Sequence, residues 1–449
     1  MKKIWLIILL AFSLEYCAAQ TIVQKDPEIE QMLKGISKDS LESYVNSLVK
    51  FGTRNTLSSI TNKKRGIGAA REWVLARFRE FALTSGGRMT CKLDSTTLAP
   101  DGKRVNENIN LGNVMAILKG VDSTDERIFL ISGHLDSRAS DVMDKMIDAP
   151  GANDDGSGVA AVMECARIMS SHRFPSTVIF VAVSGEEQGL LGSTYLADQA
   201  KKNNWDIEAV LNNDIIGSSK GSETKLSDNS RVRVFSEGLP AFQLDKQASR
   251  IRSLGLENDG KSRQLARYVK ETGERYLSNL EVVMIYRSGR FLRGGDHIPF
   301  VQRDFPAVRI TEMNENYEHQ HQTIRNENGI EYGDLPQFMD FEYLRKNTCL
   351  NLACLANLAK APAPPEEVRL EVSQLSNSTH LFWKIPKSGK VNGYYVLLRE
   401  TTSAFWQKKF YTSQTEMSLP ISKDNYFFAV QSVNADGNES IAVTALPGK

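Results

Sequence analysis

Two adjacent acidic residues, Glu186 and Glu187, follow an apolar, β-branched run at 177–183 and open a glycine-rich turn. Like charges side by side at the end of a buried strand are unfavourable unless a cation compensates them. Neighbouring side chains of extended backbone point opposite ways. One carboxylate can therefore bind a divalent metal ion while the other faces a metal-held water. The pair predicts metal-assisted hydrolysis.

Three more acid or histidine motifs stand at the ends of expected strands. His134 and Asp136 fall in Gly-His-Leu-Asp, where alternation puts them on one face and Asp136 is placed to orient the imidazole. Asp154 precedes an expected helix, whose N-terminus favours an acid, and it can bridge two metal ions. Asp214 ends a further strand and is a candidate terminal ligand.

The last candidate ligands lie in Tyr-Glu-His-Gln-His-Gln at 317–322, where either His319 or His321 can complete a metal site. Each motif taken singly has an ordinary reading, such as a helix cap or a solvated loop. In this order, at successive strand ends, the motifs together predict a metal centre. Carboxylates with imidazoles and without nearby thiolates suit zinc.

The elements that position these residues alternate between strands and helices. We expect strands at 89–98, 112–118, 128–131, 178–183, 209–211, 282–286 and 307–310. We expect helices at 26–50, 66–83, 157–171, 190–202, 241–254, 263–279 and 338–358. Continuous apolar strands between helices predict an α/β fold, a mostly parallel mixed sheet covered on both faces. Its site should form at the carboxyl ends of the strands.

The pattern changes at a proline-rich linker, residues 361–366. Short alternating strands follow, which predict a C-terminal all-β sandwich at 367–449. We expect strands there at 368–372, 379–383, 393–399, 426–433 and 441–445. The expected role is docking to protein, glycan or the cell surface, with a passive spacer as the alternative.

The N-terminus predicts export. Residues 1–19 combine a basic start, a short apolar stretch and a small-residue cleavage site, which is typical of a signal peptide. The protein is therefore expected outside the cell, in a periplasm or on a cell surface, and Cys17 leaves lipidation as an alternative. No other segment is long and apolar enough to span a membrane. The net charge of +1 gives no electrostatic case for nucleic acid.

The remaining cysteines predict no disulfide framework. Cys165 falls on an apolar helix face and is expected to be a buried thiol. Cys349 and Cys354 can form a disulfide or remain two core thiols on one helix. Their spacing on a helix gives poor disulfide geometry, which favours the thiols.

Over roughly residues 30–360 the chain resembles the two-zinc secreted aminopeptidases. These share their fold with glutamate carboxypeptidase, the transferrin receptor and glutaminyl cyclase. The matching stretches are His134-Leu-Asp-Ser, Asn153-Asp-Asp-Gly-Ser-Gly, Gly185-Glu-Glu-Gln-Gly, Asn213-Asp-Ile-Ile-Gly, Gly295-Asp-His-Ile-Pro-Phe and the late histidine. The resemblance implies a secreted zinc exopeptidase domain at 20–360 that hydrolyses N-terminal bonds of peptide or protein substrates.

The resemblance also implies two Zn²⁺ per chain and a ligand set for each ion. Asp154 would bridge the ions, and His134 and Asp214 would complete one set. Glu187 and the late histidine, taken as His321, would complete the other set.

Further roles follow from the same resemblance. Glu186 would be the general base, and the peptide bond after Asp154 would be cis. Asp136, Asp296 and His297 would support the metal ligands or line the substrate pocket, with a helix start as the alternative for the last two. Gly295 stands where the family often has serine.

Three other functions are weighed against this one. A carboxypeptidase or dipeptidase on the same scaffold could use Arg287, Arg290 and Arg293 to hold a substrate carboxylate. A one-zinc cyclase, or a non-catalytic binding protein that works through the sandwich, fits less well because every ligand position for two metals is filled.

The C-terminal segment resembles a fibronectin type III module. Trp383, Tyr395 and Tyr426 match core aromatics of that module, and residues 434–440 match its late turn.

Overall fold

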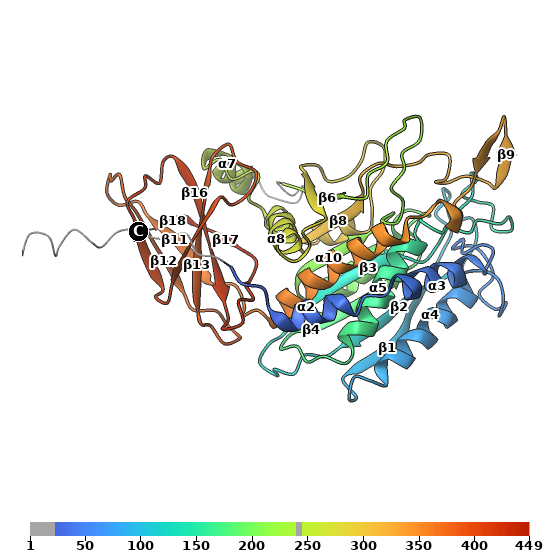
Figure 1. The fold of residues 1–449 in the computed structure, drawn as a ribbon, viewed down its shortest axis with the longest axis horizontal. Coiled ribbons are helices and arrows are strands. Elements are labelled where there is room, and N and C mark those ends of the chain that lie inside the picture. The colour runs from blue at the N-terminus through green and yellow to red at the C-terminus, as the bar shows by residue number, and fades with distance from the viewer. Residues whose placement is uncertain (1–22, 239–244, 449) are drawn as a thin grey trace, which may run out of the picture. The chain divides into compact units, whose positions relative to one another are not determined.

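The computed structural model describes residues 23–238 and 245–448. The chain divides into two compact units (Figure 1). The larger unit is Lys25–Ala361, and the smaller one comprises the described residues from Pro362 onward together with residues 23–24. The expected signal peptide, with Cys17, lies outside the described residues.

An eight-stranded mixed sheet forms the centre of the larger unit, in the order β1-β2-β4-β3-β5-β8-β6-β7. Its strands are β1 (Met89–Leu98), β2 (Ile109–Leu118), β3 (Arg127–His134), β4 (Thr177–Val183), β5 (Asp206–Asn213), β6 (Arg231–Phe235), β7 (Glu281–Ile285) and β8 (Ala307–Glu312). The β4-β3-β5-β8 core of the sheet is parallel. The pairs β1–β2, β2–β4 and β6–β8 are antiparallel, and β6 pairs parallel with β7. The predicted α/β fold with a large mixed sheet is confirmed.

Helices cover both faces of this sheet. The described helices of the larger unit are α2 (Pro27–Lys34), α3 (Lys38–Val49), α4 (Ile67–Ala82), α5 (Gly156–Met169), α6 (Leu191–Lys202), α7 (Asp245–Ser253), α8 (Lys261–Tyr276), α9 (His297–Val301) and α10 (Phe341–Lys360). Helices α4, α5, α8 and α10 pack on one face, while α6 and α9 pack on the other. A hairpin of β9 (Arg325–Glu327) and β10 (Ile330–Tyr332) and a 3₁₀ turn, η1 (Pro336–Phe338), precede α10.

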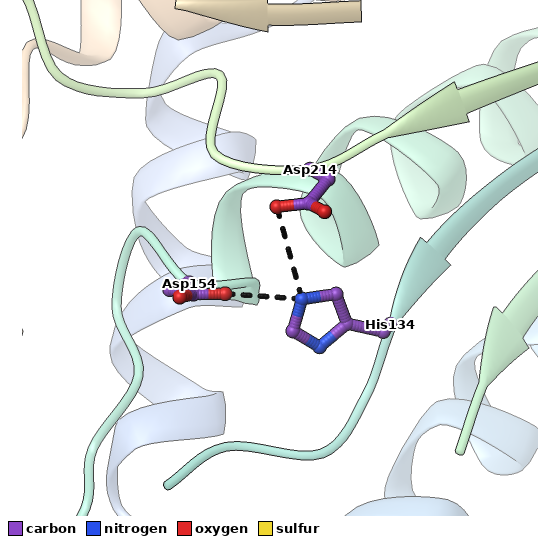
Figure 2. Close-up of side chains that lie close together, drawn as sticks. All are labelled: His134, Asp154 and Asp214. Atoms are coloured by element: carbon purple, nitrogen blue, oxygen red, sulfur yellow. Dashed lines mark ion pairs between the residues drawn. The ribbon is translucent and has the colours of Figure 1, made fainter. Parts of the chain in front are cut away.

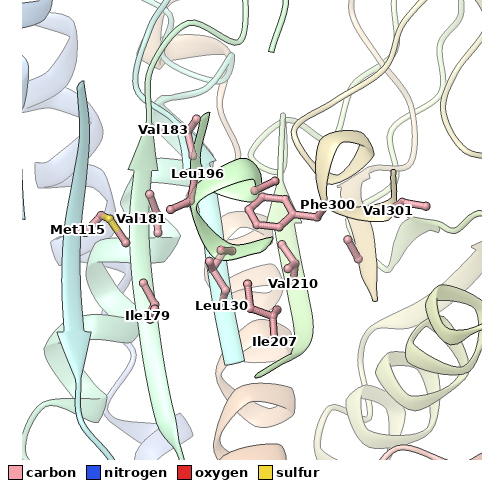
Figure 3. Close-up of a cluster of buried hydrophobic side chains, with 13 residues drawn as sticks. Met115, Leu130, Ile179, Val181, Val183, Leu196, Ile207, Val210, Phe300 and Val301 are labelled. Carbon is pink, nitrogen blue, oxygen red and sulfur yellow. The ribbon is translucent and has the colours of Figure 1, made fainter. Parts of the chain in front are cut away.

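A cluster of apolar side chains lies between the sheet and helices α6 and α9 (Figure 3). Leu196 of α6 and Phe300 of α9 pack on Leu130 of β3 and Val181 of β4, and all four side chains are buried. Removing this much apolar area from water is the main stabilising term for such a layer. It fixes the strands whose carboxyl ends carry the polar motifs.

The predicted elements appear in the predicted order, with a few corrections. One helix was expected over 26–50, but two form, because Gly35 ends α2 and the Ser37 hydroxyl accepts a hydrogen bond from Ser40 N at 3.1 Å to start α3. Strand β6 was missed because its alternate arginines made it look polar. The expected helix at 241–254 lies partly outside the described residues, and α7 is its described part.

The smaller unit contains two four-stranded sheets, in the orders β15-β12-β11-β18 and β14-β13-β16-β17. Its strands are β11 (Glu366–Glu371), β12 (Thr379–Lys384), β13 (Gly393–Glu400), β14 (Lys408–Thr412), β15 (Glu416–Leu419), β16 (Tyr426–Val433), β17 (Val443–Thr444) and β18 (Leu446–Gly448). Trp383 packs on Tyr394, with ring centroids 5.2 Å apart. Tyr395, expected in that core, instead joins a second cluster with Leu397 and Trp406.

Two findings concern the cysteines and membrane spans. Cys91, Cys165, Cys349 and Cys354 are all free thiols, so a disulfide between the last two is excluded and the core-thiol reading is confirmed. In the part of the chain that the structure describes, no helix has the length and hydropathy to cross a bilayer.

Candidate metal centre

The ligand candidates converge at the carboxyl ends of the parallel strands. His134 ends β3, Asp214 follows β5, and Asp154 lies in the turn before α5 (Figure 2). His134 Nε2 is 3.0 Å from Asp154 Oδ1 and 3.9 Å from Asp214 Oδ1. We call this group of three side chains the Asp214 position.

A second group shares Asp154. His321 Nε2 lies 2.9 Å from Asp154 Oδ2 and 2.9 Å from Glu187 Oε1. We call Asp154, Glu187 and His321 the Glu187 position. Each oxygen of Asp154 thus faces a different imidazole, which is the arrangement expected of a carboxylate that bridges two ions.

The donor chemistry fits zinc. Carboxylate oxygens and imidazole nitrogens are ordinary zinc ligands, and both groups lie with all their ligand atoms within 4.8 Å of one another. Glu187 Oε1 is buried, and the contact it makes is with His321 Nε2 at 2.9 Å, another ligand atom of the same position. A buried charge of this kind is costly unless a cation compensates it. Zinc would be held by five side chains, His134, Asp154, Glu187, Asp214 and His321.

Asp155 holds the ligand-bearing segments together. Its side chain caps α5 by accepting from Gly158 N at 2.9 Å. The same carboxylate accepts from the backbone N of His134 at 2.9 Å and of Ile215 at 3.2 Å. One acid therefore joins the end of β3, the start of α5 and the segment after β5. The peptide between Asp154 and Asp155 is cis, as expected.

The structure corrects the expected role of Asp136. Its carboxylate does not contact the His134 ring within hydrogen-bonding distance. Instead His134 Nδ1 faces the Asp136 main-chain oxygen at 3.0 Å, which leaves Nε2 free for a metal. The Asp136 carboxylate accepts from the backbone N of Gly185, Glu186 and Glu187 at 2.9, 3.2 and 3.0 Å. It thereby supports the turn that carries the acidic pair.

A buried arginine from the N-terminal segment was not found from the sequence. Arg54 is fully buried, and its Nε donates to Leu135 O at 2.6 Å. Its other nitrogens donate to the carbonyl oxygens of Pro150 and Gly151. Arg54 therefore ties the loop after β3 to the loop that leads to Asp154. No local pattern signals this contact, because its partners are backbone atoms about 80 to 100 residues away.

The structure distinguishes the two late histidines. His321 joins the Glu187 position, whereas His319 stacks on Phe338 with ring centroids 3.6 Å apart and joins neither group. Burial alone would lower the pKa of His321, but the carboxylates of Glu187 and Asp154 raise it to about 10 in the metal-free protein. Bound cations would remove that proton, because a ligand imidazole must be neutral.

A cavity of about 660 Å³ opens over the two positions. It is lined by the ligand side chains, by Glu186 and by four arginines, Arg104, Arg138, Arg290 and Arg293. Burial, opposed by His134 and reinforced by Glu187, raises the pKa of Glu186 well above its usual value in the metal-free protein. A nearby divalent ion would have the opposite effect, because it favours the charged carboxylate and so lowers the pKa.

Asp296 and His297 do not line this cavity. Asp296 accepts a hydrogen bond from Ser193 Oγ at 2.5 Å, and His297 Nε2 lies 2.5 Å from Ser288 O. Burial raises the pKa of Asp296 to about 7 and lowers that of His297 to about 4. Asp296 stands at the start of α9 but makes no side-chain cap. Both residues support the wall of the site, and the pocket-lining role is not observed.

Three further buried charges near the ligands escaped the sequence reading. Asp334 accepts from Asp154 N at 2.7 Å and from Asn153 N, and Glu312 accepts from Asn153 Nδ2 at 2.9 Å. Arg309 lies between Val308 and Ile310 of β8 and contacts Asp214. Of these three residues only Arg309 is marked in the sequence, as a charge between two apolar residues of an expected strand.

Comparisons with known proteins agree with this geometry. Residues 113–337 match the sequence model of peptidase family M28. A probable zinc metalloprotease of Leptosphaeria maculans is 43% identical over 424 residues, which cover 94% of this chain and 98% of the relative. A probable zinc metalloprotease of Pyricularia oryzae is 42% identical over 430 residues, covering 94% and 85%.

Two solved structures share the fold. The LapA aminopeptidase of Legionella pneumophila has a TM-score of 0.54 at 18% identity, covering 77% of this chain and 78% of that one. An aminopeptidase from Aneurinibacillus sp. strain AM-1 has a TM-score of 0.50 at 14% identity, covering 74% and 96%. At these identities the likeness shows the fold alone.

Proposed function

The chain belongs to peptidase family M28 as a zinc metallopeptidase, and from this premise we propose that it is a two-zinc aminopeptidase. The observation that carries the proposal is the shared carboxylate of Asp154, whose two oxygens each face a different histidine. The names of the two aminopeptidases with the same fold support the choice of peptide end.

The chemistry divides between the metal centre and Glu186. Bound zinc would lower the pKa of a water molecule and polarise the scissile carbonyl. Glu186 lines the cavity beside the ligands without belonging to either position, so it takes the proton of the attacking water. It then passes that proton to the leaving amine. Asp136 keeps Glu186 in place through the backbone of its turn.

The assignment of Glu186 is tested by Glu186→Gln. This change keeps the shape and removes the base, so turnover should fall by roughly 10²- to 10⁴-fold while zinc content stays at two per chain. The matched control is Glu107→Gln, at an exposed acid that pairs with Lys145. Normal turnover in the Glu186 variant, at full zinc content, would refute the assignment.

A carboxypeptidase or dipeptidase is the second candidate, and one observation favours it. Of the three arginines considered from the sequence, Arg290 and Arg293 line the cavity, whereas Arg287 stacks on Phe291 at 4.2 Å. Arg290 is paired with Glu315. Arg293 Nη1 is buried and hydrogen-bonds to no described residue, so it can receive a substrate carboxylate.

Peptides blocked at one end separate the two candidates. An aminopeptidase cleaves a free peptide and its C-terminally amidated form but not its N-acetylated form. A carboxypeptidase shows the reverse pattern. Product masses identify which end was shortened.

Export and the role of the smaller unit remain proposals. We propose that residues 1–19 direct export, which N-terminal sequencing of the mature protein in its native compartment would test. We propose a fibronectin type III-like docking module after the linker. Removing residues 362–449 should then abolish surface or glycan binding and leave cleavage of short peptides intact.

A further inference from the structure

A buried arginine contacts one metal position and not the other. Arg309, on β8, is fully buried, and its Nη2 lies 2.8 Å from Asp214 Oδ1. The same oxygen of Asp214 lies 3.9 Å from His134 Nε2. Asp214 Oδ1, the oxygen that would bind the metal ion, therefore also contacts a guanidinium.

The surroundings of Arg309 fix it there. Its Nη1 donates to the carbonyl oxygen of Gly294. A Cβ atom on Gly295 would lie 3.2 Å from Arg309 Cδ and 3.3 Å from its Nη1. These distances are tight, so the lack of a side chain at Gly295 leaves room for the arginine. Because the side chain is completely enclosed, it cannot turn away from Asp214.

The Glu187 position lacks such a partner. Among the described residues no guanidinium pairs with its carboxylate: the buried Glu187 Oε1 lies 2.9 Å from His321 Nε2, which is itself a ligand atom of this position. Arg104 lies on that side, but it is exposed and donates to the main-chain oxygen of Glu187 at 2.7 Å, not to the carboxylate. Glu187 therefore offers its full charge to a cation.

The group that contacts a carboxylate ligand decides whether that ligand binds zinc more tightly or more weakly. A hydrogen-bond acceptor behind a metal ligand raises the basicity of that ligand. A guanidinium does the opposite, because it draws charge from the carboxylate and adds a positive charge beside the ion. Arg290 contributes less, since Glu315 pairs with it.

We propose that Arg309 makes the two metal positions unequal, so that the Asp214 position binds zinc more weakly and empties first. The inference rests on the proposed two-zinc function. Its consequence is that peptidase activity follows the free zinc concentration over the range in which the Asp214 position fills, while the Glu187 position stays loaded.

Proteins with a single position allow each affinity to be measured alone. His321→Ala leaves the Asp214 position, and His134→Ala leaves the Glu187 position. Zinc affinity is measured by competition with a chromophoric chelator, without any activity assay. The His321→Ala protein should bind zinc about tenfold or more weakly than the His134→Ala protein, the scale of effects from groups behind metal ligands.

Adding Arg309→Met to both proteins tests the cause. Affinity should rise about tenfold in the His321→Ala background and change little in the His134→Ala background. The control is Arg267→Met, which removes a buried arginine paired with Asp259 at 2.9 Å and should alter neither affinity. Arg309→Lys keeps the charge and should leave both affinities nearly unchanged. Arg309→Gln removes the charge and replaces the methionine variant if that one fails to fold.

The outcomes are distinguishable. Equal affinities in the two single-position proteins, or an Asp214 position that Arg309→Met weakens or leaves unchanged, would overturn the inference while the two-zinc function stands. A large gain in affinity from Arg309→Lys would overturn the charge argument. Failure of either folded single-position protein to bind zinc would refute the two-zinc function itself.

Discussion

Replacing Asp136 by asparagine should disturb the Glu186–Glu187 turn without touching a metal ligand. Oδ1 of Asp136 accepts from the backbone N of Gly185 and Glu186, and Oδ2 accepts from Glu187 N and from Thr56 Oγ1 at 3.0 Å. An asparagine side chain accepts on one side only. In the less costly orientation its amide nitrogen donates to Thr56 and faces the Glu187 N–H, which loses its acceptor.

The loss of stability can be estimated from this one lost hydrogen bond. Losing a hydrogen bond to a charged group in a buried site costs about 2–4 kcal/mol once the orphaned N–H is included. The free energy of unfolding should fall by that amount. A turn displaced by roughly 1 Å would also misplace Glu186, and kcat should fall about 10²-fold. Zinc content should stay at the wild-type value.

Three measurements check this prediction: urea unfolding, peptide turnover and metal analysis. Asp141→Asn is the control, because Asp141 is exposed and accepts one backbone hydrogen bond, from Met143 N at 2.8 Å. Unchanged stability and kcat would refute the claim that Asp136 holds the turn. A fall in kcat that comes with loss of zinc would place its effect on the metal ligands instead.

Three other outcomes are expected. In the metal-free protein the folded pKa of His321, about 10, lies above its unfolded value near 6.5. Protonated His321 therefore stabilises the fold below pH ~6.5, and this stabilisation is lost as the pH rises to about 10. Melting temperatures measured with chelator should fall over this window, and an equal fall in the His321→Ala protein would contradict the assignment. Gly295→Ala should lower the free energy of unfolding by about 1–3 kcal/mol by crowding Arg309. Urea unfolding should show a smaller loss when Arg309 is also changed to methionine, and an equal loss in both backgrounds would contradict the crowding argument. Arg54→Met should cost at least about 3 kcal/mol, since it orphans buried carbonyl oxygens, and a loss under 1 kcal/mol would refute its role as a tie between loops.

Local pattern was enough to find the candidate ligands that the fold brings together and the strands that carry them. The apolar run of β4 ends in the acidic pair, and the runs of β3 and β5 end at His134 and just before Asp214. Parallel strands that end at one edge bring such residues together. His321 and His319 could not be separated this way, because their loop has no periodicity and only the fold shows which imidazole turns inward.

The supporting residues were out of reach for a physical reason. Asp334, Glu312 and Arg54 act on backbone atoms far along the chain. The residues next to them in the sequence form no motif that would indicate these contacts. Asp136 was found with its partner His134, but its main-chain oxygen and not its carboxylate faces the ring. Period-two alternation predicts a shared face and not which atom makes the contact.

The tie made by Arg54 bears on where a working fragment of this protein can begin. The stretch that matches the family, residues 113–337, contains every ligand and Glu186. It omits Arg54 and Thr56, which contact the loop after β3, and α10, which covers the sheet. A shortened protein cut to the matched stretch would keep the metal-binding residues and lose the parts that shape them. Autonomous folding of the metal centre therefore calls for the whole of Lys25–Ala361.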